Sequence, residues 1–337
     1  MADAIAVSVV VPTHQRRASM LRLCDALGRQ TVAPATFELV VSIDGSTDGT
    51  REALQSQGFP YRVRTLWQES LGRAAALNAG IAEAVGSLLI LLDDDMEPAP
   101  QFIEAHQRAH ADCARHGVMG AVPIIVGSDA TAAMRYLAAR FNGHLQNLAR
   151  PSYERRLTDF YSGNFSIRRD VLLEVSGFDE QFRVYGNEDL ELSHRLARAG
   201  VRVEYSPDAL ARQYNDKSFA QLVRDQIAEG RTSVLFAQKH PEVFGALKLG
   251  TFDDGPRALR ALRNALLAIG RRRTGLPAAI ERLERVLSRA RLPGLSAFYR
   301  LALGYFYWTG VTAELRERAW RGRGDERLLR LADELGA

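Results

Sequence analysis

Residues 88–95 read Leu88-Leu89-Ile90-Leu91-Leu92-Asp93-Asp94-Asp95, an aliphatic run that ends in three consecutive acids. An uninterrupted aliphatic run of this length is typical of a strand that is buried on both faces of a sheet. The acids are then expected at the carboxyl end of the strand, which is the edge where open α/β sheets bind ligands. This stretch therefore predicts a fold class and the position of a ligand site.

Similar runs alternate with helical patterns through the first hundred residues. We expect strands at 7–11, 37–43, 62–66 and 88–92, and helices at 19–29, 50–56 and 72–85. This alternation predicts an α/β fold in which helices cover both faces of a parallel sheet. Later patterns predict helices at 100–116, 187–199 and 219–239, and Asn187 is a possible N-cap of the second.

Charge is distributed unevenly along the chain. The formal net charge is +4, but residues 257–323 contain fifteen arginines and four glutamates, a local charge of +11. Such a region fits contact with anionic lipid, a phosphorylated acceptor or nucleic acid, or else a solvated helical surface. No recognition motif accompanies the charge, so we expect no nucleic acid partner.

This shift in composition also suggests a domain boundary. We expect a catalytic domain at 1–245, divided into a nucleotide-binding half at 1–100 and an acceptor-binding half at 101–245. A basic helical appendage would follow at 246–337.

Membrane insertion and export are not expected. The longest aliphatic run, Leu88 to Leu92, is far below the roughly 20 residues that cross a bilayer, and the first residues lack a basic segment. We expect a cytoplasmic protein, with peripheral contact at the inner membrane surface through 257–323 as an alternative. In that alternative, aromatic residues at helical spacing, such as Tyr305 and Trp308, join Arg257 to Arg291 on the membrane; otherwise they pack back onto the catalytic domain.

The acids at 93–95 predict a metal site. Adjacent carboxylates repel one another, and a hard divalent cation such as Mg²⁺ or Mn²⁺ would neutralise them while bridging to phosphate oxygens. The cation would take up charge that grows on a departing diphosphate. The alternative is an acid-rich turn that caps the next helix.

Two further segments are expected at the same edge of the sheet. Pro12-Thr13-His14-Gln15-Arg16 follows the first strand, and Asp44-Gly45-Ser46-Thr47-Asp48-Gly49 follows the second. An acid at such a strand end can bind a base or ribose, whereas Asp48 or Thr47 would more simply cap the next helix. No GxGxxG motif follows the first strand, which argues against a dinucleotide-binding dehydrogenase.

A third segment, Gly186-Asn187-Glu188-Asp189-Leu190-Glu191, places acids in the first turn of a predicted helix. Acids there gain about 0.3–1 kcal/mol from the helix dipole without having any function. A carboxylate on a rigid helix start that faces a cleft can also act as a general base toward a hydroxyl.

Taken in order, these motifs resemble a known family. The sequence contains Val10-Val11-Pro12-Thr13, Asp44-Gly45-Ser46-Thr47-Asp48, Gly72-Arg73-Ala74-Ala75-Ala76-Leu77-Asn78-Ala79-Gly80-Ile81 and Leu92-Asp93-Asp94-Asp95. This order resembles the inverting nucleotide-sugar glycosyltransferases of the GT-A fold, which include bacterial polysaccharide transferases and cellulose and chitin synthases. Three later motifs also match: Ser162-Gly163-Asn164-Phe165-Ser166-Ile167-Arg168-Arg169, Gly177-Phe178-Asp179-Glu180 and Asn187-Glu188-Asp189-Leu190-Glu191-Leu192.

The resemblance implies a fold and a set of site residues. The fold would be a Rossmann-like, mostly parallel central sheet with helices on both faces, followed by a helical C-terminal appendage. Asp189 would be the catalytic base, with Glu188 as its neighbouring candidate, and Asp95 would bind Mn²⁺ or Mg²⁺ with help from Asp93 or Asp94, one of which could instead contact the ribose. The donor would be bound by Pro12, Thr13, Arg16, Asp44, Arg73, Asn78, Asp93, Asp94 and Asn164.

The implied reaction is metal-dependent sugar transfer with inversion. The donor would be a nucleotide diphosphate sugar, first of all a UDP-sugar, and the acceptor a hydroxyl of a glycan, a lipid-linked glycan or a small molecule. The context would be polysaccharide, glycolipid or other glycoconjugate biosynthesis. The alternatives are a noncatalytic nucleotide- or sugar-binding scaffold of the same fold and a nucleotidyltransferase.

Two departures from the family pattern affect the site. Many relatives carry two acids where this chain has Ile43-Asp44, so one nucleoside contact is missing. Many also place a histidine in the region that here reads Ala211-Arg212-Gln213-Tyr214-Asn215, which leaves the third protein ligand of the metal open.

Overall fold

The computed structural model describes residues 5–112, 115–215, 217–254, 256–272, 275–289, 294–317 and 325–337. The chain divides into two compact units. Unit 1 comprises Met1–Ile125, Arg140–Arg183 and Glu188–Asn215, and unit 2 comprises Val126–Ala139, Val184–Asn187 and Asp216–Ala337. The functional division at residue 245 stays a prediction.

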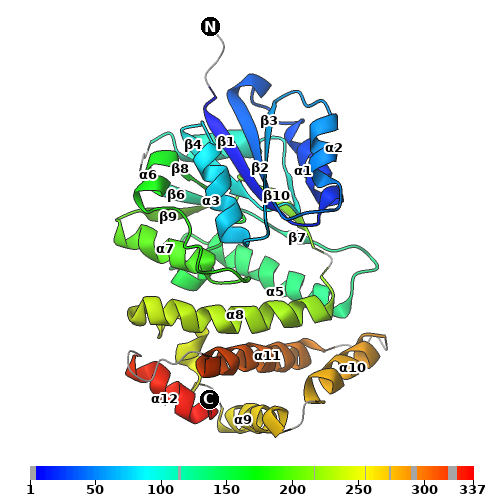
Figure 1. Ribbon diagram of the computed structural model, residues 1–337, viewed down its shortest axis with the longest axis vertical. Helices are drawn as coiled ribbons and strands as arrows, with labels where there is room; N and C mark the ends of the chain where they lie inside the picture. The colour runs from blue at the N-terminus through cyan, green and yellow to red at the C-terminus, as the bar shows by residue number, and fades with distance from the viewer. Residues whose placement is uncertain are drawn as a thin grey trace. The chain divides into compact units, whose positions relative to one another are not determined.

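Unit 1 is built on a seven-stranded sheet (Figure 1). Its strands are β1 (Val7–Thr13), β2 (Phe37–Asp44), β3 (Arg62–Gln68), β4 (Leu88–Leu92), β6 (His116–Gly120), β8 (Asn164–Arg168) and β9 (Arg202–Ser206). They lie in the order β3-β2-β1-β4-β8-β6-β9. Neighbours are parallel from β3 to β4 and from β6 to β9, whereas β8 is antiparallel to both β4 and β6.

Helices cover both faces of this sheet, as the sequence predicts. One hydrophobic cluster contains side chains of α1 (Arg17–Leu27), α2 (Thr50–Ser56), α4 (Phe102–Ala109) and the end of α5 (Ala132–Leu148), and the other those of α3 (Arg73–Glu83), α6 (Arg169–Glu174) and α7 (Glu188–Arg198). Strand β4 contributes alternately, with Ile90 in the first cluster and Leu89 and Leu91 in the second. Because successive strand residues point to opposite faces, this aliphatic run fills both cores.

A small second sheet brings another segment to the acids. Its strands are β5 (Met96–Pro98), β7 (Ile124–Ile125) and β10 (Ala211–Tyr214), in the order β5-β10-β7. Strand β5 begins directly after Asp95, and the backbone N–H of Tyr214 donates to the Asp95 carbonyl (2.9 Å). This pairing places Gln213 beside the acidic turn.

The central sheet is mostly parallel, as predicted, and β8 is its antiparallel strand. The helix expected at 100–116 is shorter, because α4 ends at Ala109 and β6 begins at His116. Asn187 has a left-handed φ of 65°, and its amide donates to the Thr232 hydroxyl (2.8 Å), while its expected role as the N-cap of α7 stays a prediction.

Unit 2 is largely helical. Its C-terminal helices are α8 (Phe219–Lys239), α9 (Arg257–Arg272), α10 (Leu276–Arg289), α11 (Ser296–Glu317) and α12 (Glu326–Leu335). Helix α8 begins with a capping box formed by Ser218 and Gln221. It crosses α11 closely at two glycines, since a Cβ on Gly310 would collide with the Ile227 carbonyl oxygen and a Cβ on Gly230 with that of Tyr307.

The aromatic residues of α11 are core residues of unit 2. Tyr305, Phe306 and Trp308 are buried, and the rings of Phe252 and Trp308 meet edge to face at 4.8 Å. These side chains therefore pack inside unit 2, which leaves them unavailable as an aromatic membrane stripe. None of the helices in the described parts of the chain has the length and apolar character of a membrane span.

Candidate active site

The loops that follow β1 and β2 are tied together at the carboxyl edge of the sheet. The Gln15 backbone N–H donates to the Ser46 hydroxyl (2.9 Å), and the Arg17 N–H donates to Asp48 (2.9 Å). Asp48 also accepts the Thr50 N–H at the start of α2 (3.2 Å), although the N-cap position is Gly49 and not Asp48 or Thr47 as expected. Gln15 has a left-handed φ of 54°, a conformation that non-glycine residues rarely adopt outside turns and binding sites.

Asp44 ends β2 and organises the turn that leads into α3. Its carboxylate accepts the Gln68 side-chain amide (2.8 Å) and the backbone N–H groups of Leu71 (2.9 Å) and Gly72 (3.0 Å). These bonds fix the entry to α3, whose first residue is Arg73. Asp44 thus lies at the predicted edge, where it holds the turn that positions the arginine.

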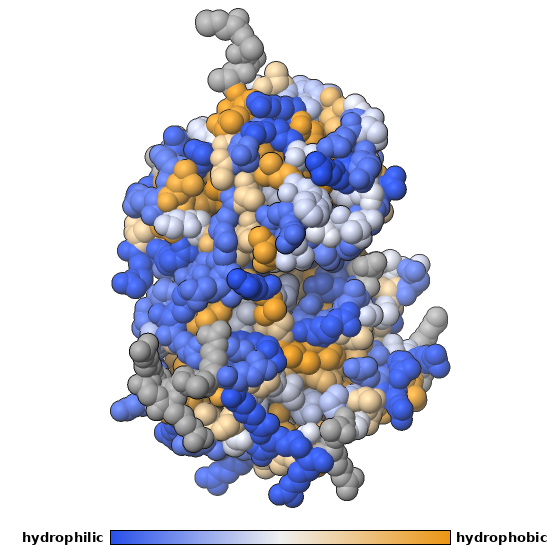
Figure 2. All heavy atoms as spheres, viewed as in Figure 1, coloured by the Kyte–Doolittle hydropathy of each residue, from blue (hydrophilic) through white to orange (hydrophobic). Residues whose placement is uncertain are grey.

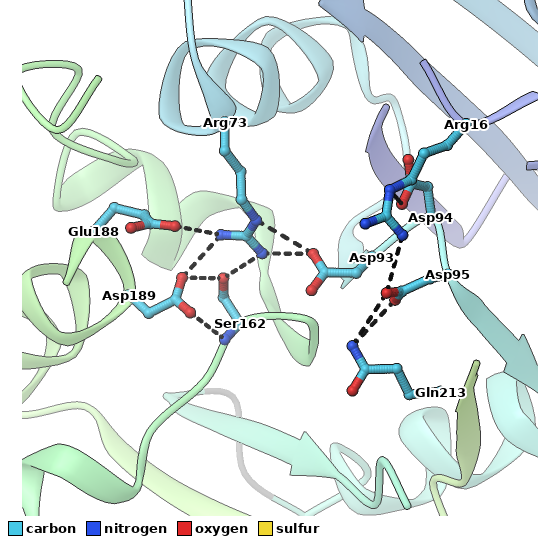
Figure 3. Close-up of polar contacts among 9 residues, drawn as sticks. All are labelled: Arg16, Arg73, Asp93, Asp94, Asp95, Ser162, Glu188, Asp189 and Gln213. Carbon is cyan, nitrogen blue, oxygen red and sulfur yellow. Dashed lines mark hydrogen bonds and ion pairs between the residues drawn. The ribbon is translucent and has the colours of Figure 1, made fainter. Parts of the chain in front are cut away.

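The acids at 94 and 95 share Arg16 as a partner, and each also has a partner of its own (Figure 3). Asp94 accepts the hydroxyl of Thr13 (2.7 Å), and Asp95 accepts hydrogen bonds from Arg16 (3.2 Å) and from the Gln213 amide (3.2 and 3.3 Å). Burial raises the pKa of Asp94 to about 7, although the Arg16 charge and the Thr13 hydroxyl act in the opposite direction. Mutual repulsion among the acids is therefore partly relieved by the protein itself.

Asp93 points instead to Arg73, which also contacts the start of α7. The Arg73 guanidinium donates to Asp93 (2.8 Å), Asp189 (2.9 Å), Glu188 (3.3 Å) and the Ser162 hydroxyl (3.0 Å). Burial alone would lower the pKa of Arg73, but the charges of Asp93, Asp189 and Glu188 outweigh it and hold the pKa well above its ordinary value. One cation thus joins the acidic turn to the predicted base.

Ser162 is a site residue that sequence reasoning missed. Its hydroxyl donates to Asp189 (2.5 Å), and its backbone N–H donates to the other oxygen of the same carboxylate (3.3 Å). It opens the matched Ser162-Gly163-Asn164 motif, from which only Asn164 was selected as a donor residue. The signal was present in the motif, but nothing local to a serine in a loop identifies its partner.

Two of the predicted donor-binding residues, Asn164 and Asn78, form hydrogen bonds with other segments of the chain. Asn164 is fully buried, with its amide bonded to His106 (2.9 Å) and to the Ala209 carbonyl (2.8 Å). Asn78 makes paired hydrogen bonds with the backbone of Phe178, at 2.9 and 2.8 Å. Both amides anchor chain segments, and the donor-binding roles expected of Asn164 and Asn78 stay predictions.

The residues present fit a divalent cation that takes only a few of its ligands from the protein. Mg²⁺ is usually bound through one or two carboxylates together with substrate phosphates, and Asp95 and Asp93 flank the acidic turn. A half-turn of the Gln213 amide would present its oxygen, a hard ligand, to the same place. Pro12 is buried in β1 beside Thr13, so it shapes the edge through its backbone.

An α/β sheet with an acidic turn at its carboxyl edge, linked through one arginine to a carboxylate at a helix start, defines a glycosyltransferase domain of the GT-A fold. The family model described as glycosyl transferase family 2 matches residues 8–176. The chain therefore belongs to glycosyl transferase family 2. A second model, the N-terminal domain of galactosyltransferase, matches residues 143–217.

Among curated proteins, the chain is 32% identical over 227 residues to validoxylamine A glucosyltransferase of Streptomyces hygroscopicus subsp. limoneus, covering 60% of this chain and 50% of that protein. It therefore spans about half the length of that relative. It is also 24% identical over 230 residues to glycosyltransferase AglE of Haloferax volcanii, covering 68% of this chain and 73% of that protein.

Solved structures support the fold. The mannosyltransferase PcManGT from Pyrobaculum calidifontis, in complex with GDP-Man and Mn²⁺, matches with a TM-score of 0.59 and 18% identity, covering 93% of this chain and 87% of that one. S. aureus TarS 1–349 in complex with UDP-GlcNAc matches with a TM-score of 0.52 and 15% identity, covering 94% and 93%. At these identities the likeness shows the fold alone.

Proposed function

We propose that this protein is a metal-dependent, inverting glycosyltransferase that moves a sugar from a nucleotide diphosphate sugar, with a UDP-sugar as the first donor to test, to an acceptor hydroxyl. The observation that carries this proposal is the position of Arg73, which donates to Asp93 at 2.8 Å and to Asp189 at 2.9 Å. A donor bound at the acidic turn would therefore lie within reach of the candidate base.

Asp189 is better suited than Glu188 to be that base. The Asp189 side chain is 24% exposed and the Glu188 side chain 5%, so an acceptor can reach the first more easily. One oxygen of Asp189 is engaged by Arg73 and Ser162, and the other accepts only the long bond from the Ser162 N–H among the described residues. That second oxygen would take the acceptor proton as the hydroxyl attacks the anomeric carbon.

On the donor side, Asp95, Asp93 and the amide oxygen of Gln213 would hold the cation. Bound there, the cation would neutralise the charge that develops on the diphosphate leaving group. Arg16, which lies against Asp95, would contribute a charge-assisted hydrogen bond to a phosphate oxygen. Attack from one face and departure from the other give a single inversion at the anomeric carbon.

Similar proteins support this donor class. The mannosyltransferase structure contains GDP-Man and Mn²⁺, and the TarS structure contains UDP-GlcNAc. One of these nucleotides carries guanine and the other uracil, so the base that this protein prefers has to be measured. For the acceptor we propose a glycan, a lipid-linked glycan or a small molecule in glycoconjugate biosynthesis, with peripheral contact of the basic region 257–323 with an anionic membrane.

The first test is a thermal-shift screen against UDP, GDP, dTDP and CDP, each with Mn²⁺, Mg²⁺ or a chelator, because a ligand that binds only the folded state raises its apparent stability. We expect a metal-dependent shift with one nucleotide. Absence of any shift would contradict the proposal and favour a noncatalytic scaffold.

The second test is Asp189→Asn, assayed for release of the nucleoside diphosphate with and without acceptor. We expect the nucleotide shift to persist while turnover falls by roughly 10²- to 10⁴-fold, the usual contribution of a general base. Glu188→Gln is the matched control and should affect turnover less. Near-normal turnover of Asp189→Asn would remove Asp189 from its role.

A further inference from the structure

Helix α9 has two opposite faces, and its apolar stripe is the outer one. Leu267 is buried, and the Arg263 guanidinium lies 3.7 Å from the centre of the Phe252 ring, so these residues mark the packed face. The opposite face carries residues at helical spacing that are all exposed: Ala258, Ala261, Leu262, Ala265 and Ile269. A helical period that places apolar residues away from the core implies a second apolar environment.

Helix α10 repeats the arrangement. Glu284 is buried and accepts the Tyr299 hydroxyl (3.0 Å), which identifies the inner face. Ala279, Leu283 and Val286 are exposed on the other side. The larger aliphatic residues on the outer faces of the two helices, Leu262, Ile269, Leu283 and Val286, are 43–63% exposed.

Both apolar stripes are flanked by exposed arginines. Arg257 and Arg272 lie at the two ends of α9, and Arg282, Arg285 and Arg289 line one edge of the α10 stripe. Hydrophilic side chains gather along the lower edge of the view in Figure 2, where Figure 1 places α9. Aliphatic residues bordered by guanidinium groups match the chemistry of a bilayer surface, with acyl chains beneath phosphate headgroups.

We propose that the outer faces of α9 and α10 bind the surface of an anionic membrane. This inference rests on the proposed function, in which the basic region 257–323 contacts an anionic membrane, and it names the residues that make the contact. A second copy of this chain is a poorer occupant, because a self-complementary interface would bring the α10 arginines of the two copies close together. A membrane supplies the opposite charge.

The test is flotation of the full chain with vesicles of phosphatidylglycerol and phosphatidylcholine, compared with vesicles of phosphatidylcholine alone. We expect binding to the anionic vesicles, weakened by salt, and little binding to the neutral ones. The double variant Leu262→Gln/Ile269→Gln should bind at least about tenfold more weakly, since each aliphatic side chain loses its favourable transfer from water. Leu173→Gln, an equally exposed leucine on α6, is the matched control and should bind like the wild type.

A charge variant separates the two contributions. Arg282→Gln/Arg285→Gln/Arg289→Gln should weaken binding to anionic vesicles and reduce its dependence on salt. All altered side chains are exposed, so the thermal melts and the nucleotide response should stay like those of the wild type. Loss of vesicle binding with an intact nucleotide response therefore concerns this surface and not the active site.

Three outcomes would overturn the inference. The first is a wild-type chain that does not float with anionic vesicles, and the second is equal flotation with neutral vesicles. The third is a wild-type dimer by light scattering that the Leu262→Gln/Ile269→Gln variant converts to a monomer, which would assign the surface to a second copy. An absent nucleotide response with intact vesicle binding would contradict the proposed function and leave this surface standing.

Discussion

Replacing Arg73 by methionine should destabilise unit 1 strongly, because the ion pairs that Arg73 forms are largely buried. The guanidinium contacts Asp93, Glu188 and Asp189 at 2.8 to 3.3 Å, and its side chain is only 23% exposed. Methionine keeps much of the aliphatic volume but removes the charge. The carboxylates would then face one another in a partly buried place without a cation.

The magnitude follows from burial. Breaking a buried ion pair by removing one partner costs about 3–5 kcal/mol, because the remaining charge is left uncompensated. Arg73 is partly exposed, so the lower end of that range, about 3 kcal/mol, is the better expectation. For a domain of this size that corresponds to a fall in Tm of roughly 6–12 °C.

Arg115→Met is the control. Arg115 forms a bidentate pair with Glu174 at 2.7 Å, a geometry at least as good as that of Arg73, but the Arg115 side chain is 46% exposed. Exposed pairs of this kind contribute little and are screened by salt. Thermal and urea unfolding of both variants, at low and high salt, compare the same interaction in two environments.

The reasoning predicts a large loss for Arg73→Met that salt hardly changes and no measurable loss for Arg115→Met. Arg73→Lys should lie between the wild type and Arg73→Met, since it keeps the positive charge but its ammonium group cannot reproduce the planar fork that contacts several carboxylates at once. Equal stability of the Arg73→Met and Arg115→Met variants would refute the argument from burial.

Three further predictions concern other parts of the molecule. Burial lowers the pKa of His106 to about 4, so between about pH 6.5 and 4 the unfolded chain binds more protons than the folded chain. The free energy of unfolding therefore falls as the pH falls through this range. His106→Gln should remove about 3 kcal/mol of this pH dependence, measured by urea unfolding across the same range. Gly310→Ala should lower the Tm, because its Cβ would meet the Ile227 carbonyl and overpacking costs roughly 1–3 kcal/mol; an unchanged melt would show that the crossing of α8 and α11 is looser. Gln213→Ala should weaken Mn²⁺ binding in the presence of nucleotide by about tenfold, and Gln213→His should strengthen it. Equal Mn²⁺ affinity of the variants and the wild type, measured by electron paramagnetic resonance titration, would show that Gln213 is not a ligand of the cation held by Asp95.

The elements that could be predicted from sequence are those with strong local signals. Strand β4 is an unbroken aliphatic run and α8 an amphipathic stretch followed by Pro241, so both were predicted with their observed ends. The placement of Thr13 and Asp94 at one edge followed from the rule that ligand sites lie at the carboxyl ends of parallel strands, and their hydrogen bond is a finding of the structure.

What escaped prediction depends on contacts between distant segments. The antiparallel direction of β8 is set by the path of the chain after β6, and no residue within β8 encodes it. Asn164 has the residue type expected of a ligand-binding amide, but its partner His106 comes from α4, 58 residues earlier. Likewise, the Asn187 amide donates to Thr232 of α8, 45 residues later in the sequence.

The segment that enters β8 joins the two halves of the proposed chemistry. Ser162 holds the candidate base Asp189 through its hydroxyl and its backbone N–H. Gly163 accepts the Asp93 N–H (3.0 Å), and a Cβ at this position would collide with the Asp93 carboxylate. Asn164 anchors the segment in the core. One strand entry therefore contacts Asp189 through Ser162 and the backbone of Asp93 through Gly163, an arrangement that favours the preorganisation that a displacement between two bound substrates requires.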